Sequence, residues 1–182
     1  MPHVCPWWLT YAIDNPVRKY LHDPRAILSP YVSAGMTVLD LGCGMGIFSI
    51  AMARMVGDEG RVIAVDLQQR SLDVLAARAR KAGVAHRILT RRAEPNRLGL
   101  REPADFALAF AVLHEVPDAR GFLFEVASCL KPGGRFLLAE PKGHVTPQMF
   151  GEELAMAREA GLDVVERPQV RISHAAVMRR RA

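Results

Sequence analysis

Apolar runs of strand length alternate with longer segments of helical spacing from Thr37 onward, and this alternation constrains the fold more than any other feature. A parallel β-sheet covered by helices produces such a pattern, because each crossover between parallel strands carries a helix. The last two apolar runs lie too close together for a crossover helix, so we expect those strands to be antiparallel. The sequence therefore predicts an α/β fold with seven strands, at Thr37–Leu41, Arg61–Val65, Arg87–Arg91, Phe106–Ala111, Arg135–Glu140, Asp163–Arg167 and His174–Arg179.

Apolar stripes between these runs predict the helices, and residues that favour helix ends mark their limits. Residues 1–34 precede the first strand and are predicted to form short helices that act as a lid over the core of residues 35–182. The predicted helices are Ile47–Val56, a helix that stops at Gly83, one from Asp118 to Pro132 and Gly133, one from Thr146 and Pro147 to Gly161, and N-terminal helices broken by Pro16, Pro24 and Pro30.

Composition is that of one globular domain spanning residues 1–182, since half of the residues are hydrophobic and 24% are charged. No apolar run reaches the roughly 18 residues of a membrane span, and the N-terminus lacks a signal-peptide pattern. Three cysteines without a CxxC pair indicate neither a disulfide framework nor a cysteine zinc site. We therefore expect a reduced, cytoplasmic location.

A net charge of +5 and a pI of about 9.5 raise the possibility of a nucleic-acid partner. The basic residues are scattered, however, and this distribution does not favour such a partner. The modest groups are Arg91, Arg92, Arg97 and Arg101, and the terminal Arg179, Arg180 and Arg181.

The strongest motif is a strand that runs through Val38 and Leu41 into a turn with Gly42, Gly44 and Gly46, followed directly by a helix. Glycines allow positive φ angles and close approach of a ligand to the backbone, and the helix start offers unpaired N–H groups. A dinucleotide-binding turn shares this context, but its third glycine has a different spacing. The turn therefore predicts a nucleotide-like ligand other than NAD.

An acidic residue, Asp66, ends the second predicted strand. In nucleotide-binding α/β proteins a carboxylate at this place accepts the ribose hydroxyls. The alternative is a solvated residue that caps the next helix, and the pairing with the glycine turn favours the ribose.

Four blocks in order give the chain its resemblance to class I S-adenosylmethionine-dependent methyltransferases. The blocks are the glycine turn, Asp66, the segment from Asp105 to Asp118, and the segment from Leu130 to Arg135. The resemblance covers Thr37 to about Arg179 and implies the strand order 3-2-1-4-5-7-6 with strand seven antiparallel. It also implies S-adenosylmethionine as cofactor and S-adenosylhomocysteine as product. The chain is similar to small-molecule enzymes of the quinone-biosynthesis and arsenite groups, although it lacks the cysteine set of an arsenite enzyme.

The resemblance also assigns roles around the cofactor. Asp40, Gly42 and Gly44 would hold the methionine part, Asp66 the ribose, and Phe110 would lie beside the cofactor. Where many relatives place an Asp near the adenine, this chain has Ala93 and Glu94, so either the backbone at Ala93 or the Glu94 side chain makes that contact. The cofactor-binding set expected from the resemblance is Asp40, Gly42, Cys43, Gly44, Asp66, Leu67, Ala93, Glu94 and Phe110.

The acceptor is expected beyond the fourth and fifth strands or against the N-terminal segment, where an open α/β sheet has its crevice. His114 is the candidate base, and the alternative is a structural histidine that hydrogen-bonds a loop beneath the cofactor. A metal site at Glu140, His144 and His114 is not favoured, because Pro141 and Gly143 place these residues in a loop. The candidate substrate residues are Trp7, Trp8, Tyr11, Glu140 and His144.

The sequence thus predicts methyl transfer to a small-molecule acceptor by in-line displacement, which depends mainly on alignment of the reacting atoms. Two alternatives remain: an RNA or protein methyltransferase, and a non-catalytic protein that has kept the cofactor-binding fold. The sequence leaves the oligomeric state open.

Overall fold

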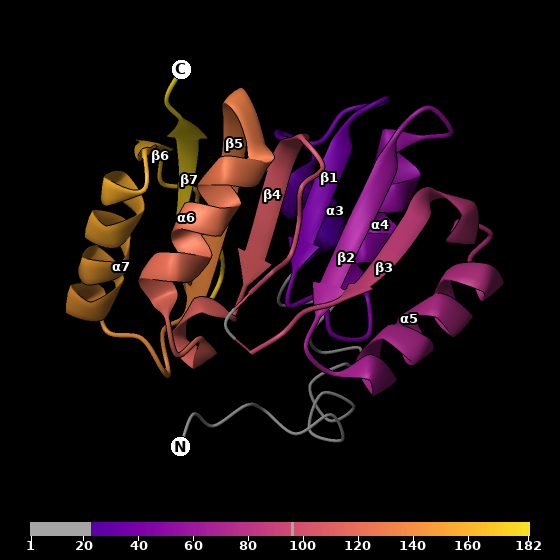
Figure 1. Ribbon diagram of the computed structural model, residues 1–182, viewed down its shortest axis with the longest axis horizontal. Coiled ribbons are helices and arrows are strands. Elements are labelled where there is room, and N and C mark those ends of the chain that lie inside the picture. The colour runs from indigo at the N-terminus through magenta and orange to yellow at the C-terminus, as the bar shows by residue number, and fades with distance from the viewer. Residues whose placement is uncertain (1–22, 96) are drawn as a thin grey trace.

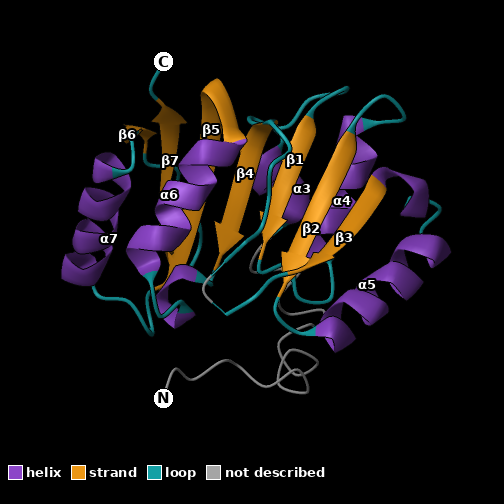
Figure 2. Cartoon of the chain, in the orientation of Figure 1, coloured by secondary structure: helices purple, strands orange, loops and turns teal. Residues whose placement is uncertain are grey.

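The computed structural model describes residues 23–95 and 97–182. Their strands form one sheet in the order β3-β2-β1-β4-β5-β7-β6 (Figures 1 and 2). Strand β7 is antiparallel to both β5 and β6, and the other neighbouring strands are parallel. The structure therefore confirms the α/β fold, the strand order and the antiparallel final pair. The strands are β1 (Thr37–Leu41), β2 (Arg61–Asp66), β3 (Ile88–Arg92), β4 (Ala104–Phe110), β5 (Leu130–Pro141), β6 (Leu162–Glu166) and β7 (Ser173–Arg180).

Side-chain oxygens cap two of the helices at the predicted residues. Asp118 accepts a hydrogen bond from the Gly121 N–H, and Thr146 accepts one from the Met149 N–H, so orphan donors of the first turn are satisfied. None of the described helices is long and apolar enough to cross a membrane. The helices are α3 (Pro24–Leu28), α4 (Ile47–Val56), α5 (Gln69–Lys81), α6 (Ala119–Cys129) and α7 (Pro147–Glu159), with the 3-10 turns η1 (Ala85–Arg87) and η2 (Leu113–Glu115).

The core lies on both faces of the sheet, because successive strand residues point to opposite sides. Leu39 and Leu138 pack in one cluster with residues of α6 and α7, whereas Val38 and Leu137 pack in another with residues of α3 and α4. Figure 1 shows α6 and α7 in front of the sheet and α3 and α4 behind it. Burial on both faces explains why the central strands read as continuous apolar runs.

Several predicted boundaries differ from the structure. Strand β4 ends at Phe110 because Ala111 has a φ of 59°, which leaves the extended conformation. Strand β5 begins at Leu130, which is buried and pairs with Ala104, so the helix before it ends earlier than predicted. Pro24 does not break a helix but opens α3, as expected of proline in a first turn.

The connection from β3 to β4 contains no helix among its described residues, which distinguishes it from the other crossovers. Leu98 and Leu100 of this connection are buried in the cluster that α6 and α7 cover. Glu125 of α6 accepts hydrogen bonds from the N–H groups of Leu98 and Gly99, at 2.9 and 3.2 Å. An extended segment tied to α6 thus covers the sheet where a crossover helix would otherwise lie.

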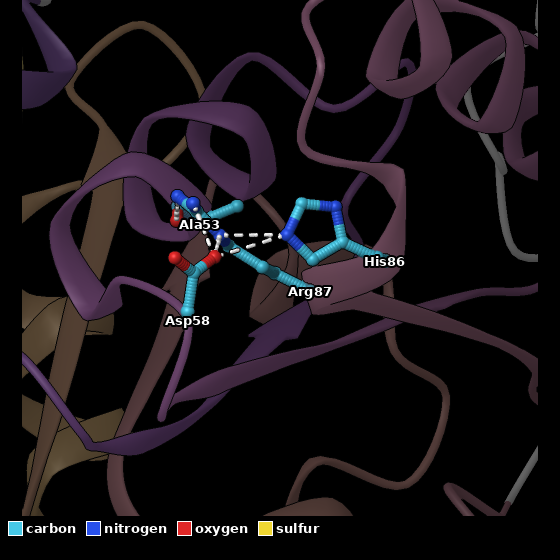
Figure 3. A network of polar contacts seen from close by, with 4 residues as sticks. All are labelled: Ala53, Asp58, His86 and Arg87. Atoms are coloured by element: carbon cyan, nitrogen blue, oxygen red, sulfur yellow. Dashed lines mark hydrogen bonds and ion pairs between the residues drawn. The ribbon is translucent and has the colours of Figure 1, made fainter.

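A polar network joins the amino ends of the strands (Figure 3). Asp58, between α4 and β2, contacts His86 Nε2 at 3.1 Å and Arg87 Nε at 2.9 Å. The Arg87 guanidinium also donates to the carbonyl of Ala53 at 3.1 Å. These contacts hold the start of β3 against the end of α4.

Candidate active site

The strand order reverses between β1 and β4, and this reversal places the candidate site. The chain passes from β1 to β2 and β3 on one side, then returns to β4 on the other. The loops that leave the carboxyl ends of β1 and β4 therefore diverge, and ligands of open α/β sheets bind in the crevice between them. The described residues that are predicted to bind cofactor and acceptor lie at, or directly after, the carboxyl ends of β1, β2, β3, β4 and β5.

The glycines of the turn after β1 all have positive φ, at 70°, 50° and 86° for Gly42, Gly44 and Gly46. Their surroundings differ. A Cβ at Gly42 would meet the Val112 side chain at 2.3 Å, and one at Gly46 would meet Leu75 at 2.1 Å. A Cβ at Gly44 would meet no atom of the described residues within 4 Å. Gly42 and Gly46 thus allow close packing, whereas the described residues leave space at Gly44 for a ligand to approach the backbone.

Asp66, at the end of β2, is hydrogen-bonded to this turn. Its Oδ2 accepts from the Gly44 N–H and its Oδ1 from the Gln68 N–H, both at 2.8 Å. Burial raises the pKa of the Asp66 carboxyl, and the two backbone donors oppose that rise. A carboxylate oxygen has about two acceptor sites, so Asp66 retains capacity for further donors.

Asp40 is in β1 just before the turn, and Cys43 is a residue of the turn itself. Asp40 is 3% exposed and accepts a hydrogen bond from the Ser49 hydroxyl of α4. Burial, together with the charges of Asp40 and Asp66, raises the pKa of the Cys43 thiol well above its ordinary value. Cys43 is therefore a neutral, packed thiol.

The residues expected beside the adenine occupy the loop after β3. The Ala93 N–H donates to the Asp66 carbonyl at 3.0 Å, and the Leu67 carbonyl accepts from Arg92 Nε at 3.3 Å. Glu94 is exposed, and its backbone pairs with that of Arg97. Ala93 and Leu67 thus lie in two neighbouring loops that border the site, with Glu94 one residue beyond.

The end of β4 turns sharply toward β5. The Phe110 ring is buried and lies 4.6 Å from the Phe48 ring, centroid to centroid. Ala111 follows in the left-handed region, where residues other than glycine are strained. Its N–H donates to the Ala139 carbonyl at 2.7 Å, so the turn is fixed to β5.

That turn aims backbone and side-chain donors at Glu140, the last buried residue of β5. Glu140 is fully buried, and its Oε1 accepts from the N–H groups of Val112 and Leu113 at 3.1 and 2.8 Å. Its Oε2 is hydrogen-bonded to His114 Nδ1. An ionised carboxylate only accepts, so Nδ1 carries the proton and Nε2 of a neutral His114 remains an acceptor.

The imidazole of His114 is perturbed by this partner. The hydrogen bond that His114 donates to Glu140 raises the pKa of His114, and partial burial opposes the rise. The Nε2 atom lies 3.9 Å from Glu115 Oε1. The exposed His144, from the loop after β5, meets the His114 ring edge-on with 5.4 Å between centroids. The structure thus brings together His114, Glu140 and His144.

Glu153 of α7 is a member of this cluster that sequence reasoning missed. It is 7% exposed and interacts electrostatically with both Glu140 and His114. The signal was present, because Glu153 interrupts the buried stripe of Phe150, Leu154 and Ala157. A charged residue on the apolar face of a helix is a mismatch that packing alone does not explain.

The remaining candidates contribute less to the described site. Trp7, Trp8 and Tyr11 lie outside the described residues. Several arginines are engaged within the molecule: Arg91 pairs with Glu102, Arg181 with Asp163, and Arg180 with backbone carbonyls.

Comparison of the chain with known proteins shows which protein family it resembles. A family model described as "Methyltransferase domain" matches residues 32–171. A ubiquinone biosynthesis O-methyltransferase of Xanthomonas euvesicatoria is 33% identical over 73% of this chain and 55% of its own length. A demethylmenaquinone methyltransferase of Lactobacillus johnsonii is 32% identical over 64% of this chain and 48% of its own length. The chain spans about half the length of these curated relatives.

Solved structures agree in fold. A SAM-dependent methyltransferase from Aquifex aeolicus superposes with a TM-score of 0.86 over 97% of this chain and 99% of its own, at 24% identity. A SAM-dependent O-methyltransferase from Thermotoga maritima superposes with a TM-score of 0.72 over 88% of this chain and 65% of its own, at 21% identity. The strand order and the glycine turn with its acidic partner thus define a class I S-adenosylmethionine-dependent methyltransferase. The chain belongs to the methyltransferase domain family.

Proposed function

We propose that this chain transfers a methyl group from S-adenosylmethionine to a small-molecule acceptor. One observation carries the proposal: the open side of the glycine turn, at Gly44, is hydrogen-bonded to the Asp66 carboxylate at the switch point of the sheet. The His114–Glu140 pair, which is suited to removing a proton, lies where the neighbouring strands β4 and β5 end, and this position supports the proposal. The printed names of the quinone-biosynthesis relatives support a small acceptor.

The residues on the β1 and β2 side fit the cofactor. Gly44 leaves room for the methionine part, with Gly42, Cys43 and the Asp40 carboxylate at the same strand end. Asp66 retains acceptor sites for the ribose hydroxyls, while its bonds to Gly44 and Gln68 hold the carboxylate in position. The Ala93 backbone, with Leu67, Glu94 and Phe110 around it, borders the adenine side.

The bound cofactor supplies a methyl group on a positively charged sulfur, so the leaving group needs no acid. The protein must therefore align the acceptor and, where the acceptor is a hydroxyl, remove its proton. His114 is the group for that step: Glu140 fixes its Nδ1–H, and Nε2 accepts the proton. His144, Trp7, Trp8 and Tyr11 are proposed to contact the acceptor.

Calorimetric titration of the full chain with S-adenosylhomocysteine tests the cofactor site. We expect binding at one site per chain. A folded sample that shows no binding at millimolar ligand would overturn the proposal.

Acceptor chemistry is tested with hydroxylated aromatic and quinol compounds, by mass spectrometry for a gained methyl group. His114→Gln should lower kcat by about 100-fold or more if His114 is the base, with unchanged affinity for S-adenosylhomocysteine. A loss of that affinity with an unchanged kcat would instead identify a structural histidine beneath the cofactor.

A further inference from the structure

Glu153 occupies a position where an apolar side chain would pack without cost. It lies on the buried stripe of α7, between Phe150 and Leu154, and is 7% exposed. Its Oε2 is sealed from solvent and has no hydrogen-bond partner among residues 23–95 and 97–182. A buried polar atom without a partner is rare and costs free energy, so it calls for an explanation other than packing.

The groups around Glu153 provide that explanation. The buried face of α7 lies against the end of β5, because Phe150 stacks on His174 with 5.5 Å between ring centroids and His174 pairs with Glu140 in the sheet. Glu140 and His114 both affect the pKa of Glu153 from that side. Both Glu140 oxygens are engaged, by the backbone of Val112 and Leu113 and by His114. The carboxyl groups of Glu140 and Glu153 thus both act on one imidazole inside the fold, and of these two it is Glu140 that is hydrogen-bonded to the ring.

Within the part of the chain that the structure describes, charged side chains on the neighbouring elements α6 and β6 have other partners. On α6, Arg120 is paired at the surface with Glu159, and on β6, Asp163 is paired with Arg181. The other titratable groups near the cluster are Glu115, which acts on His114; His144, whose ring meets that of His114; and His174, which pairs with Glu140 in the sheet and stacks on Phe150.

We propose that Glu153 is a positioning residue for His114: it titrates as one unit with the His114–Glu140 pair, and its charge decides whether the imidazole is free to accept a proton. The role of Glu153 in methyl transfer rests on the proposed function, whereas the coupling between the titrations of Glu153 and His114 does not.

The coupling has a definite direction. Burial and the charge of Glu140 raise the pKa of Glu153 to about 7, and His114 opposes that rise. The ionised Glu153 in turn raises the pKa of His114. Near neutral pH the two side chains therefore compete for one proton: either Glu153 is neutral and His114 can accept, or Glu153 is charged and His114 holds the proton. Such pairs titrate in shared macroscopic steps rather than independently.

The test follows the His114 ring by NMR as a function of pH in the full-length chain without cofactor, with His114→Gln used to assign its signal. Glu153→Gln preserves the shape and removes the charge, so the His114 midpoint should fall by about 1 pH unit. Glu152→Gln is the matched control, because Glu152 is the exposed neighbour on the same helix and should leave the midpoint unchanged. An unchanged midpoint in folded Glu153→Gln overturns the proposal.

A second measurement covers the case in which Glu153→Gln does not fold. The carboxyl carbon of Glu153 in the unmodified chain should titrate near neutral pH, with an inflection shared with His114. A single ordinary transition near pH 4.5, the usual value for Glu, would overturn the proposal. Because both titrations are made without cofactor, failure of methyl transfer and failure of this coupling are separate results.

Discussion

Two networks of carboxylates with histidine or arginine lie at opposite ends of the sheet, and they differ mainly in burial. At the amino end, the Asp58 side chain is 73% exposed and contacts His86 and Arg87 (Figure 3). At the carboxyl end, the Glu140 side chain is fully buried and contacts His114. Solvent screens the first set of charges, and exposed ion pairs contribute little to stability. The second set interacts at low dielectric, where protonation states shift.

The lesson is that similar residue types serve different purposes according to burial. Hydrogen bonds with His86 and Arg87 lower the pKa of Asp58, so this group is ionised at neutral pH. The Glu140 hydrogen bond raises the pKa of His114 instead, and burial raises that of Glu153 to about 7. The buried network thus contains a carboxyl group that changes its charge near neutral pH, which suits proton transfer.

Glu140→Ala should have the largest effect of any change in the two networks. It removes the acceptor of two backbone N–H groups and of His114, and leaves those donors buried. We expect a loss of about 3–5 kcal/mol in the free energy of unfolding, measured by urea denaturation. Asp58→Ala is the counterpart at the other end and should change the midpoint far less. Equal losses would contradict the contrast drawn from burial.

The pH dependence of stability should have opposite signs at the two ends. Between about pH 4.5 and 7 the folded protein holds a proton on Glu153 that the unfolded chain releases, so stability falls as pH rises through this window. The shift corresponds to about 3 kcal/mol. His114 adds to the same trend, since its raised pKa gives stability that is lost above its unfolded value.

Asp58 works in the other direction, because its lowered pKa gives stability that is lost as pH falls. Urea denaturation of the Glu153→Gln and Asp58→Asn variants at several pH values separates the contribution of Glu153 to the pH dependence of stability from that of Asp58. Glu153→Gln should flatten the decline between pH 4.5 and 7. If stability still declined between pH 4.5 and 7 in this variant, the decline would have to come from a group other than Glu153.

Asp66→Ala should weaken binding of S-adenosylhomocysteine by roughly 1–3 kcal/mol, because the ribose hydroxyls would lose their acceptor. Calorimetry measures the change, and Asp58→Ala serves as a control at the far end of the sheet. An unchanged dissociation constant would remove Asp66 from the cofactor site.

We expect the smallest effect to be the change with salt concentration in the stability that the Asp58 network contributes. Any difference in melting temperature between the unmodified chain and Asp58→Asn should shrink as the salt concentration rises to 1 M, where the Debye length is about 3 Å. The effect of Glu140→Gln should remain, since a buried pair is screened much less. Thermal melts at low and high salt make the comparison.

The sequence predicted the elements whose signals are local. Strand β1 and helix α4 have the predicted bounds, and Asp118 and Thr146 cap their helices as expected. The start of β5 was predicted too late, because the pairing of Leu130 with Ala104 is a tertiary contact that Pro132 and Gly133 conceal. The resemblance also gave the strand order, which the structure confirms.

The sequence predicted which residues form the candidate site, but it did not predict the hydrogen bonds between them. His114, Glu140 and His144 were all named from their places after strands. That Glu140 accepts from His114 depends on the left-handed turn at Ala111, which no local signal announces. Glu153 lies on a different helix, and only packing of α7 against the rest of the fold brings it to the cluster.

The contact between Gly42 and Val112 has a consequence for engineering. The Val112 methyl groups fill the space that a Cβ at Gly42 would occupy, and the Val112 N–H donates to Glu140. Under the proposed function, Val112 would therefore contact both the turn that binds the cofactor and the residues that bind the methyl acceptor. A redesign that reshapes this loop to admit a bulkier acceptor alters the cofactor turn as well, so selection for a new acceptor must be carried out together with selection for retained cofactor affinity.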